Sequence, residues 1–184
     1  MTNYFSEILI LLTLIGDFII ILFIILYVYQ MIKGKRLFNN IKLFLENNYI
    51  IISFIISLAA TLGSLYYSEI LHYNPCKLCW YQRIFMYPQT IIFGTAYIIK
   101  DKKIAIYGMI LSIIGAFIAG FHYMLQLSNS PSFSCDAIGY SASCTEKFFL
   151  SYYYITIPIM AVTAFGLLII LGLYGKNKIS PSIQ

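Results

Sequence analysis

The chain has 184 residues, of which 60% are hydrophobic and only 10% are charged, and its mean hydropathy is +0.82. This composition excludes a soluble domain of any size and is typical of an integral membrane protein. The formal net charge of +5 is interpreted below as a signal of membrane topology and not of nucleic-acid binding.

Five apolar segments follow one another along the chain, each near the roughly 17–25 residues that a helix needs to cross a bilayer. They are Ile8–Ile32, Tyr49–Tyr67, Ile84–Ile99, Ile104–Leu127 and Phe148–Tyr174. The sequence therefore predicts an all-α integral membrane protein, a four-helix transmembrane bundle plus one additional N-terminal transmembrane helix. Residues 1–48 would hold the additional helix and a basic loop, residues 49–175 the four-helix domain, and residues 176–184 a tail.

The first segment is expected to be a retained helix, because no basic region precedes it and no small-residue cleavage site follows it. Asp17 is an acidic residue inside this segment, and an acid within a membrane is a candidate functional group. Packing of Asp17 against another helix explains it equally well. The third segment covers only ~24 Å at 1.5 Å per residue, so its helix either has snorkelling ends or begins earlier, inside the motif PCKLCWYQR.

Two further features are expected to be structural. Ala116 and Gly120 have the small-x-x-x-small spacing that lets membrane helices approach closely. Pro158 is expected to kink the fifth helix.

The distribution of basic residues predicts the topology. Nine of the twelve Lys and Arg residues fall in the first and third connections and in the tail, and basic residues concentrate on the cytoplasmic side. The N-terminus and the connections at about 69–81 and 128–147 then face outward, and the C-terminus lies in the cytoplasm. We expect a multi-pass protein of the bacterial inner (cytoplasmic) membrane.

All four cysteines lie in the two outward connections: Cys76 and Cys79 in the first, Cys135 and Cys144 in the second. The space outside the bacterial inner membrane is oxidising, so disulfides are expected there. A Cys-x-x-Cys pair closes a very small loop and is usually a labile redox couple. Two structural bridges remain an alternative, and so does a zinc site with four thiolates.

Two polar pairs at helical spacing accompany the cysteines. Arg83 follows Cys79 by four residues, so a guanidinium beside the sulfur would favour its thiolate form. His122 and Gln126 have the same spacing, and both are costly in an apolar helix unless they face a partner, a cavity or a cofactor. The alternatives are a lipid-binding anchor for Arg83 and an interhelical hydrogen bond for His122 and Gln126.

The run PCKLCWYQR, the downstream HYMLQL and the second cysteine pair resemble the DsbB family of quinone-linked membrane thiol oxidases, in its compact BdbC-like branch. The resemblance covers about residues 49–174. It implies catalytic roles for all four cysteines and a quinone site formed by Cys79, Arg83, His122 and Gln126, with no metal. It further implies that Cys135 and Cys144 accept electrons from a DsbA-like thioredoxin-fold partner and that Cys76 passes them to Cys79.

The expected function is thus a protein-dithiol:quinone oxidoreductase that reoxidises this partner and reduces ubiquinone or menaquinone. Two departures from the family pattern limit the comparison: only eight residues separate Cys135 from Cys144, and the N-terminal helix is additional. The alternatives are a membrane carrier of thiol reductant and a non-enzymatic scaffold with structural disulfides.

Overall fold

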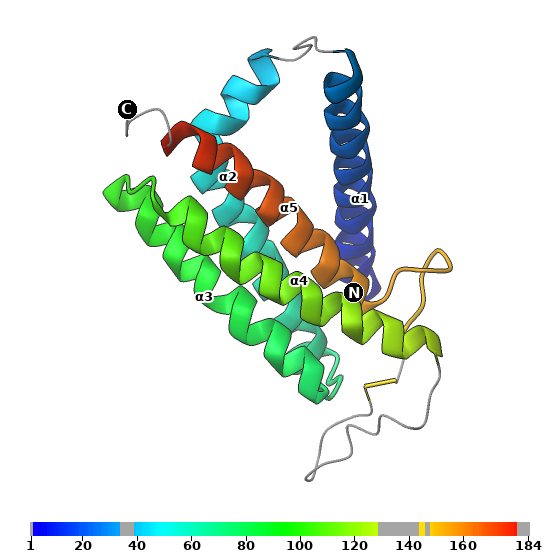
Figure 1. Cartoon of the computed structure of the whole chain (residues 1–184). Coiled ribbons are helices and arrows are strands. Elements are labelled where there is room, and N and C mark those ends of the chain that lie inside the picture. Colours follow the sequence, from blue (N-terminus) through cyan, green and yellow to red (C-terminus); the bar gives the residue numbers. More distant parts are fainter. Residues whose placement is uncertain (1, 34–38, 129–143, 146–147, 180–184) are drawn as a thin grey trace.

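The computed structural model describes residues 2–33, 39–128, 144–145 and 148–179. These residues form five long helices and one short π-helical turn, with no strand among them, so the all-α prediction is confirmed (Figure 1). The elements are α1 (Thr2–Lys33), α2 (Asn39–Leu65), η1 (Tyr66–Ile70), α3 (Lys77–Ile99), α4 (Ile104–Ser128) and α5 (Ile157–Ile179).

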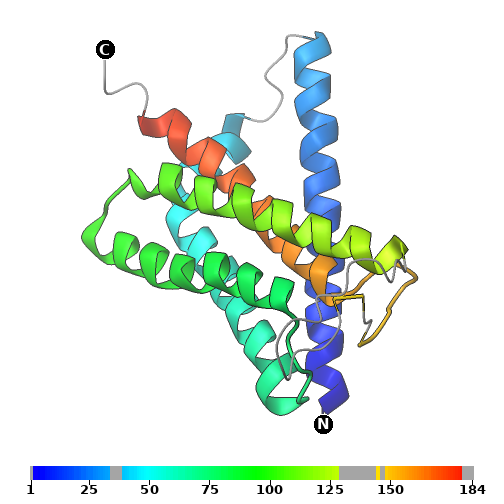
Figure 2. The same ribbon diagram turned by 60° about the horizontal axis from the view of Figure 1, so that its bottom comes forward.

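Helices α2 to α5 form the bundle, and α1 lies outside it. Helix α4 packs along α5, α3 packs against both α2 and α4, and α2 closes the bundle against α5. Helix α1 packs mainly on α5, and Figure 2 shows it standing beside the other four helices. The bundle thus has a core of its own, and α1 adds a fifth helix to one side.

Four of the described helical segments are long and apolar enough to cross a membrane: α1, α2 with η1, α4 and α5. Helix α3 is not among them, because its first turns carry polar side chains such as Gln82, Arg83 and Gln89. It nevertheless runs between α2 and α4 and packs on both. Its polar groups are therefore placed against neighbouring helices, as a membrane helix requires.

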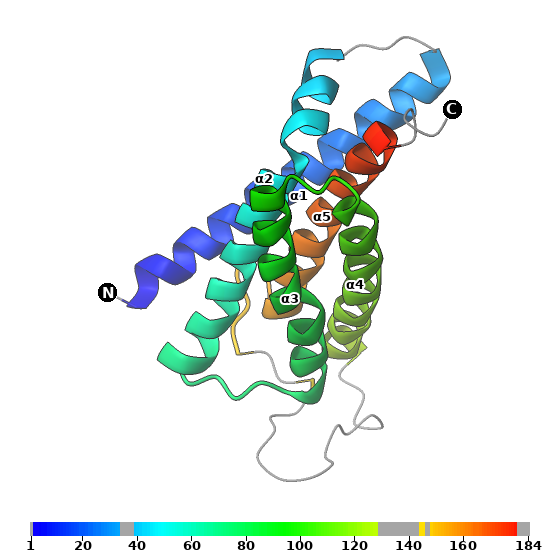
Figure 3. The ribbon, with the colours of Figure 1, turned by 90° about the vertical axis from the view of Figure 1, so that its left-hand side faces the viewer.

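The ends of the helices alternate between the two ends of the bundle. The C-terminal ends of α1, α3 and α5 and the N-terminal ends of α2 and α4 lie together, and the remaining ends of α2 to α5 lie opposite (Figure 3). Six lysines at or next to helix ends gather at the first of these ends: Lys33, Lys42, Lys100, Lys102, Lys103 and Lys176. Lys77, at the start of α3, lies at the other end. This arrangement matches the charge pattern from which the topology was predicted.

Three helix boundaries differ from those predicted by hydrophobicity alone. Helix α2 begins at Asn39 instead of residue 49. The additional turns before residue 49 are polar and are stabilised by the Lys42–Glu46 ion pair of 3.5 Å. Helix α3 begins at Lys77, inside the cysteine motif. Helix α5 begins at Ile157, nine residues later than predicted, so Pro158 lies in its first turn and the predicted kink is wrong. Proline fits a first turn because its missing N–H has no partner there.

In the core of the bundle, aromatic rings pack directly against glycines of neighbouring helices. A side chain on Gly115 would collide with the ring of Phe165, which is fully buried, and one on Gly108 would collide with Phe93. The predicted close approach at Gly120 is wrong, since among the described residues no atom from outside its own stretch of helix would lie within 4 Å of a Cβ there. Close helix packing through small residues occurs instead at Gly108 and Gly115.

Asp17 attaches α1 to the bundle. Thr163 of α5 donates a hydrogen bond of 2.6 Å to Asp17 Oδ1, and Tyr154 donates one of 2.9 Å to Oδ2. The neighbouring Gly16 lies against Thr163, so that a Cβ there would be 2.6 Å from the Thr163 methyl group. Of the two explanations for this acid, packing against another helix is the one that the contacts support.

Thr163→Val should destabilise the protein, because it removes one donor to Asp17 while keeping the shape of the side chain. Hydrogen bonds between membrane helices are worth on the order of 1 kcal/mol, which corresponds to a fall in Tm of roughly 2–4 °C for a chain of this size. Thermal unfolding in detergent measures it, with Thr163→Ser as the control that keeps the hydroxyl. A Tm of Thr163→Val equal to that of the wild type would show that the bond contributes nothing.

Candidate redox site

The first cysteine of the motif caps helix α3. Cys76 has an extended backbone with φ −73° and ψ 171°, and its sulfur accepts a hydrogen bond from the backbone N–H of Cys79 at 3.4 Å. Pro75 precedes it, and the residues from Lys77 onward are helical. The Cys76 sulfur is therefore held at the positive end of the helix dipole, a position that stabilises a thiolate.

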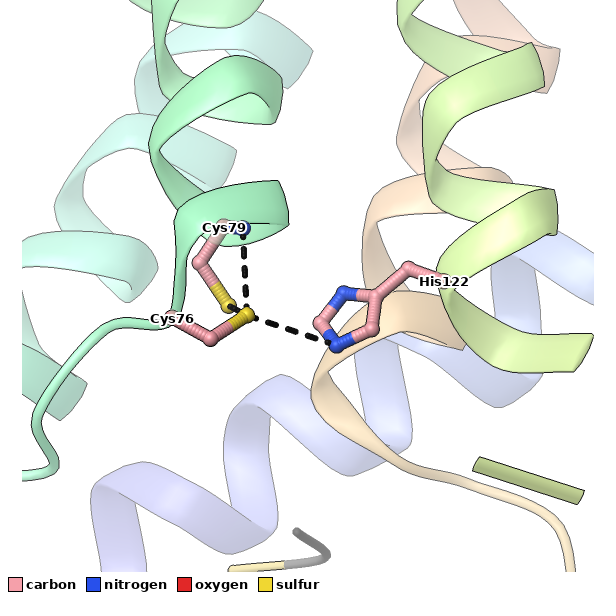
Figure 4. A group of neighbouring side chains, drawn as sticks. All are labelled: Cys76, Cys79 and His122. Atoms are coloured by element: carbon pink, nitrogen blue, oxygen red, sulfur yellow. Dashed lines mark hydrogen bonds between the residues drawn. The ribbon is translucent and has the colours of Figure 1, made fainter. Parts of the chain in front are cut away.

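Cys76 and Cys79 are free thiols and lie in contact with His122 of α4 (Figure 4). The two sulfurs are 3.2 Å apart and joined by a hydrogen bond, and His122 Nε2 is 3.6 Å from the Cys76 sulfur. Cys76 and His122 are both only 2% exposed. The imidazole thus contacts Cys76, and its closeness to the pair comes from the packing of α3 on α4.

Gln82 positions the imidazole, and the sequence analysis did not single it out. Its side-chain nitrogen lies 2.9 Å from His122 Nδ1, and a partner on one ring nitrogen decides what the other can do. When the Gln82 side-chain N–H donates to His122 Nδ1, the proton of the neutral imidazole is on Nε2, the ring nitrogen that faces the Cys76 sulfur. The available signal was a second polar residue, three positions after Cys79, in an otherwise apolar helix.

The contacts favour negative charge on Cys76. The hydrogen bond with Cys79, and then the contact with His122, lower the pKa of the Cys76 thiol to about 4, although burial opposes the shift. The sequence analysis expected the thiolate at Cys79 beside Arg83. The helix cap and His122 instead give Cys76 the larger set of stabilising contacts.

Cys144 lies in the same buried cluster as Cys76. Its side chain is fully buried, it is disulfide-bonded, and it packs with Cys76 and Leu125. Cys135 lies outside the described residues. A sulfur in a disulfide cannot serve as a thiolate ligand, so the zinc site of four thiolates does not fit this arrangement.

Stacked aromatic rings hold the connection between η1 and α3 against the segment that follows Cys144. Tyr73 stacks on Phe148 with ring centroids 4.8 Å apart, and Tyr67 stacks on Phe149 at 5.4 Å. Tyr67 and Tyr73 also stack on each other at 6.0 Å. Offset stacking of this kind stabilises such contacts, and here it keeps the two cysteine-bearing connections together.

A large cavity begins beside the second cysteine. It has a volume of about 1140 Å³, and Cys79, Gln82 and Arg83 form part of its lining. The spacing of Cys79 and Arg83 predicted that they share one helix face, and both line this cavity. The remaining lining residues are mostly apolar and come mainly from α1, α2 and α5.

Arg83 is fixed by contacts with α2 and with its own helix. Its Nε and Nη2 donate to Ser64 Oγ at 3.0 Å and to Ser64 O at 3.3 Å, and its guanidinium lies over the rings of Trp80 and Tyr87. A guanidinium has five N–H donors. Among the described residues Ser64 takes two of them, so donors remain for an oxygen atom bound in the cavity.

His122 and Gln126 do not line this cavity. Both are buried, at 2% and 3% exposure, and His122 lies on the Cys76 side of the cysteine pair. His122 is nevertheless bonded to Gln82, which does line the cavity, so the expected place of His122 and Gln126 at the ring of a quinone stays a prediction. His122 could instead join Cys76 and Cys79 as a metal ligand, since the three ligand atoms lie within 4.8 Å of one another.

Comparisons with known proteins relate the chain to disulfide bond formation proteins. The family described as "Disulfide bond formation protein DsbB" matches residues 46–175. The "SPbeta prophage-derived disulfide bond formation protein B" of Bacillus subtilis is 40% identical over 126 residues, which is 68% of this chain and 84% of that protein. "Disulfide bond formation protein C" of Bacillus subtilis is 43% identical over 122 residues, 64% of this chain and 85% of that protein. No solved structure matches the chain.

The reduced cysteine pair should keep a thiolate at acidic pH, and His122 should be one reason. In a form carrying Cys135→Ser and Cys144→Ser, thiolate ultraviolet absorbance should persist well below roughly pH 8.5, the pH below which an ordinary thiol is neutral, because the contacts of Cys76 lower its pKa. Because folding lowers this pKa, the thiolate stabilises the reduced protein above the ordinary pKa, and that stabilisation is lost as pH falls towards the folded pKa.

His122→Ala should move the midpoint of that titration upward, because it removes a contact that stabilises the thiolate. His72→Ala is the matched control, since His72 is the only other histidine in the chain and is exposed. A midpoint that His122→Ala leaves in place would contradict the role of the imidazole.

Proposed function

Because the chain belongs to the DsbB family of disulfide bond formation proteins, we propose that it oxidises a thioredoxin-fold partner and passes the electrons to a membrane quinone. Its role in disulfide formation and its place in a membrane follow from the family and from the apolar helices. The quinone, the partner and the outward orientation of the cysteines are the proposal.

One observation carries this proposal: the two sulfurs of the Cys-x-x-Cys pair have different surroundings. Cys76 is buried in a cluster with Cys144, against which Cys79 also packs, but only Cys79 of the pair lines the cavity with Arg83. An electron relay needs one sulfur near the donor disulfide and the other near the acceptor. A purely structural bridge has no need of this division.

The relay begins at the second cysteine pair. A partner thiolate attacks Cys135, the bond between Cys135 and Cys144 breaks, and Cys144 leaves as a thiolate. The second partner thiol then attacks the mixed disulfide, so the partner leaves oxidised and two electrons and two protons are transferred. Cys144 is the sulfur placed to attack Cys76 when the Cys76–Cys79 disulfide is formed, because the two pack together.

Attack on Cys76 makes Cys79 the leaving thiolate. Cys135 then attacks the Cys144–Cys76 bond and restores its disulfide with Cys144, which leaves Cys76 and Cys79 reduced. In this structure Cys76 and Cys79 are likewise free thiols and Cys144 is disulfide-bonded. The helix cap and His122 stabilise the thiolate of Cys76 and lower the energy of the reduced pair.

The cavity fits a quinone, because its lining joins polar side chains beside Cys79 to a long apolar wall. When bound, a quinone accepts two electrons and two protons and becomes a quinol. Arg83, held by Ser64, would donate a hydrogen bond to a ring oxygen and stabilise negative charge there. His122 and Gln126 would support the cysteine pair from the α4 side. The sequence and the fold leave the choice of ubiquinone or menaquinone open.

The competing functions fit the cysteines less well. A carrier of thiol reductant needs a thiol near the opposite end of the bundle, but all four cysteines of the chain lie in the two outward connections. A scaffold with structural bridges gives no reason for the contacts of Cys76 with His122 and of Arg83 with Ser64.

Arg83→Ala should raise the KM for quinone while leaving the KM for the partner unchanged. Hydrogen bonds to charged groups are worth about 1.5–3 kcal/mol, so the quinone KM should rise on the order of tenfold or more. Quinone reduction by the purified protein and a reduced partner measures both constants. Lys77→Ala is the control. It removes a positive charge near the start of the same helix, but Lys77 is exposed and does not line the cavity.

The proposed function would be overturned if the protein reduced no quinone, or if it reduced quinone without needing any of its cysteines. A quinone KM that Arg83→Ala leaves unchanged would remove Arg83 from the site.

A partner stripped of its second thiol should form a stable mixed disulfide with Cys135, since it cannot resolve the bond. Cys135→Ser should abolish this complex. Mass spectrometry of the linked peptides identifies the cysteine of this chain that is joined to the partner. A linkage at Cys76 would reverse the order of the two pairs.

A further inference from the structure

The N-terminal helix has no counterpart in the matched family segment, which begins at residue 46. It nevertheless supplies a wall of the cavity that starts at Cys79. Lining residues occur along α1 from Leu9 through Leu22 to Gln30. The additional helix is therefore part of the surface that faces whatever the cavity holds.

The cavity has polar side chains beside the cysteine and again at Gln30 and Lys42, and most of the lining between them is apolar. Cys79, Gln82 and Arg83 contribute the polar side chains of α3. The walls from α1, α2 and α5 are mostly aliphatic and aromatic, with Leu22, Ala59 and Leu167 among them. A matching ligand has a polar head at Cys79 and a long apolar chain.

The length of the wall formed by α1 distinguishes between two kinds of apolar ligand tail, a phospholipid acyl chain and a polyprenyl chain. The span from Leu9 to Gln30 is about 32 Å at 1.5 Å per residue, close to the ~30 Å thickness of a bilayer's hydrocarbon core. A phospholipid acyl chain belongs to one leaflet and covers about half of that thickness. A polyprenyl chain attached to a head group at Cys79 can follow the whole wall.

Contacts near the N-terminal end of α1, at its middle and at Phe23 hold the helix in place. Phe5 packs on Tyr66 of η1, with ring centroids 4.4 Å apart, and Phe23 packs on Tyr174 of α5 at 5.9 Å. Between them Asp17 accepts hydrogen bonds from Thr163 and Tyr154. These contacts fix α1 against α5, and the cavity lies between α1, α2 and α5.

We infer that α1 forms a wall of a channel for the polyprenyl tail of the quinone. This inference rests on the proposed function and adds a specificity to it: the protein selects quinones by tail length through a helix that the family segment lacks. Moving an apolar tail from lipid into an apolar channel gains little hydrophobic free energy, because lipid tails are as apolar as leucine. The gain comes from close packing, so a several-fold preference is expected.

Two quinones with the same head group test the inference, one with a full polyprenyl tail and one with a single isoprenoid unit. Leu22→Trp places bulk in the channel far from Cys79. It should raise the ratio of the long-tailed KM to the short-tailed KM about threefold or more. Ile21→Trp is the matched control, since Ile21 neighbours Leu22 on α1 and both side chains are exposed, but only Leu22 lines the cavity. Turnover of the short-tailed quinone shows that each variant is folded.

A binding measurement complements the kinetics. A long-tailed quinone with a photoreactive group on its tail should crosslink to residues 9–30, and excess unlabelled long-tailed quinone should prevent this. Crosslinks confined to α2 and α5, or a KM ratio that Leu22→Trp does not change, would overturn the inference and leave the proposed function intact. Failure of both quinones to oxidise the reduced wild-type protein would overturn the proposed function, and the inference with it.

Discussion

The cap of helix α3 is the interaction on which the site depends. The amide of Cys79 binds the sulfur of Cys76, so both cysteines are placed within one helical turn, yet their sulfurs have different surroundings. Helix α4 then brings His122 to Cys76, and α2 brings Ser64 to Arg83. If the helix began a few residues later, the motif would be an exposed loop and this division between buried cluster and cavity would be lost.

The polar groups inside the apolar bundle show how the surrounding structure supports this cap. An unpaired polar group is costly in such an environment, and the polar side chains of α3 are paired with other helices: Gln82 with His122, Arg83 with Ser64, and Gln89 with Ser112. These bonds fix the rotation of α3 about its axis. That rotation decides which side chains face the cavity and which face the cysteine cluster.

Apolar segments and charge predicted the five helices and their order, because membrane crossing imposes a length and a polarity that can be read locally. The boundaries were less predictable: hydrophobicity does not distinguish the helical residues after Ile157 from the non-helical stretch before them. Cys79 and Arg83 were found through their spacing within one helix. The contacts of Cys76 with His122 and of His122 with Gln82 join separate helices, so the rotation of each helix had to be known. The wall formed by α1 follows from packing alone.

The division between the two sulfurs is tested most directly by the redox state of Cys76 and Cys79 in a Cys144→Ser variant. Purified protein in lipid is incubated with quinone and reduced partner, and free thiols are alkylated and assigned by mass spectrometry. The account predicts that Cys76 and Cys79 stay oxidised, since the quinone can withdraw their electrons but the partner cannot supply new ones without Cys144. Reduction of this pair by the partner at the wild-type rate would contradict the relay.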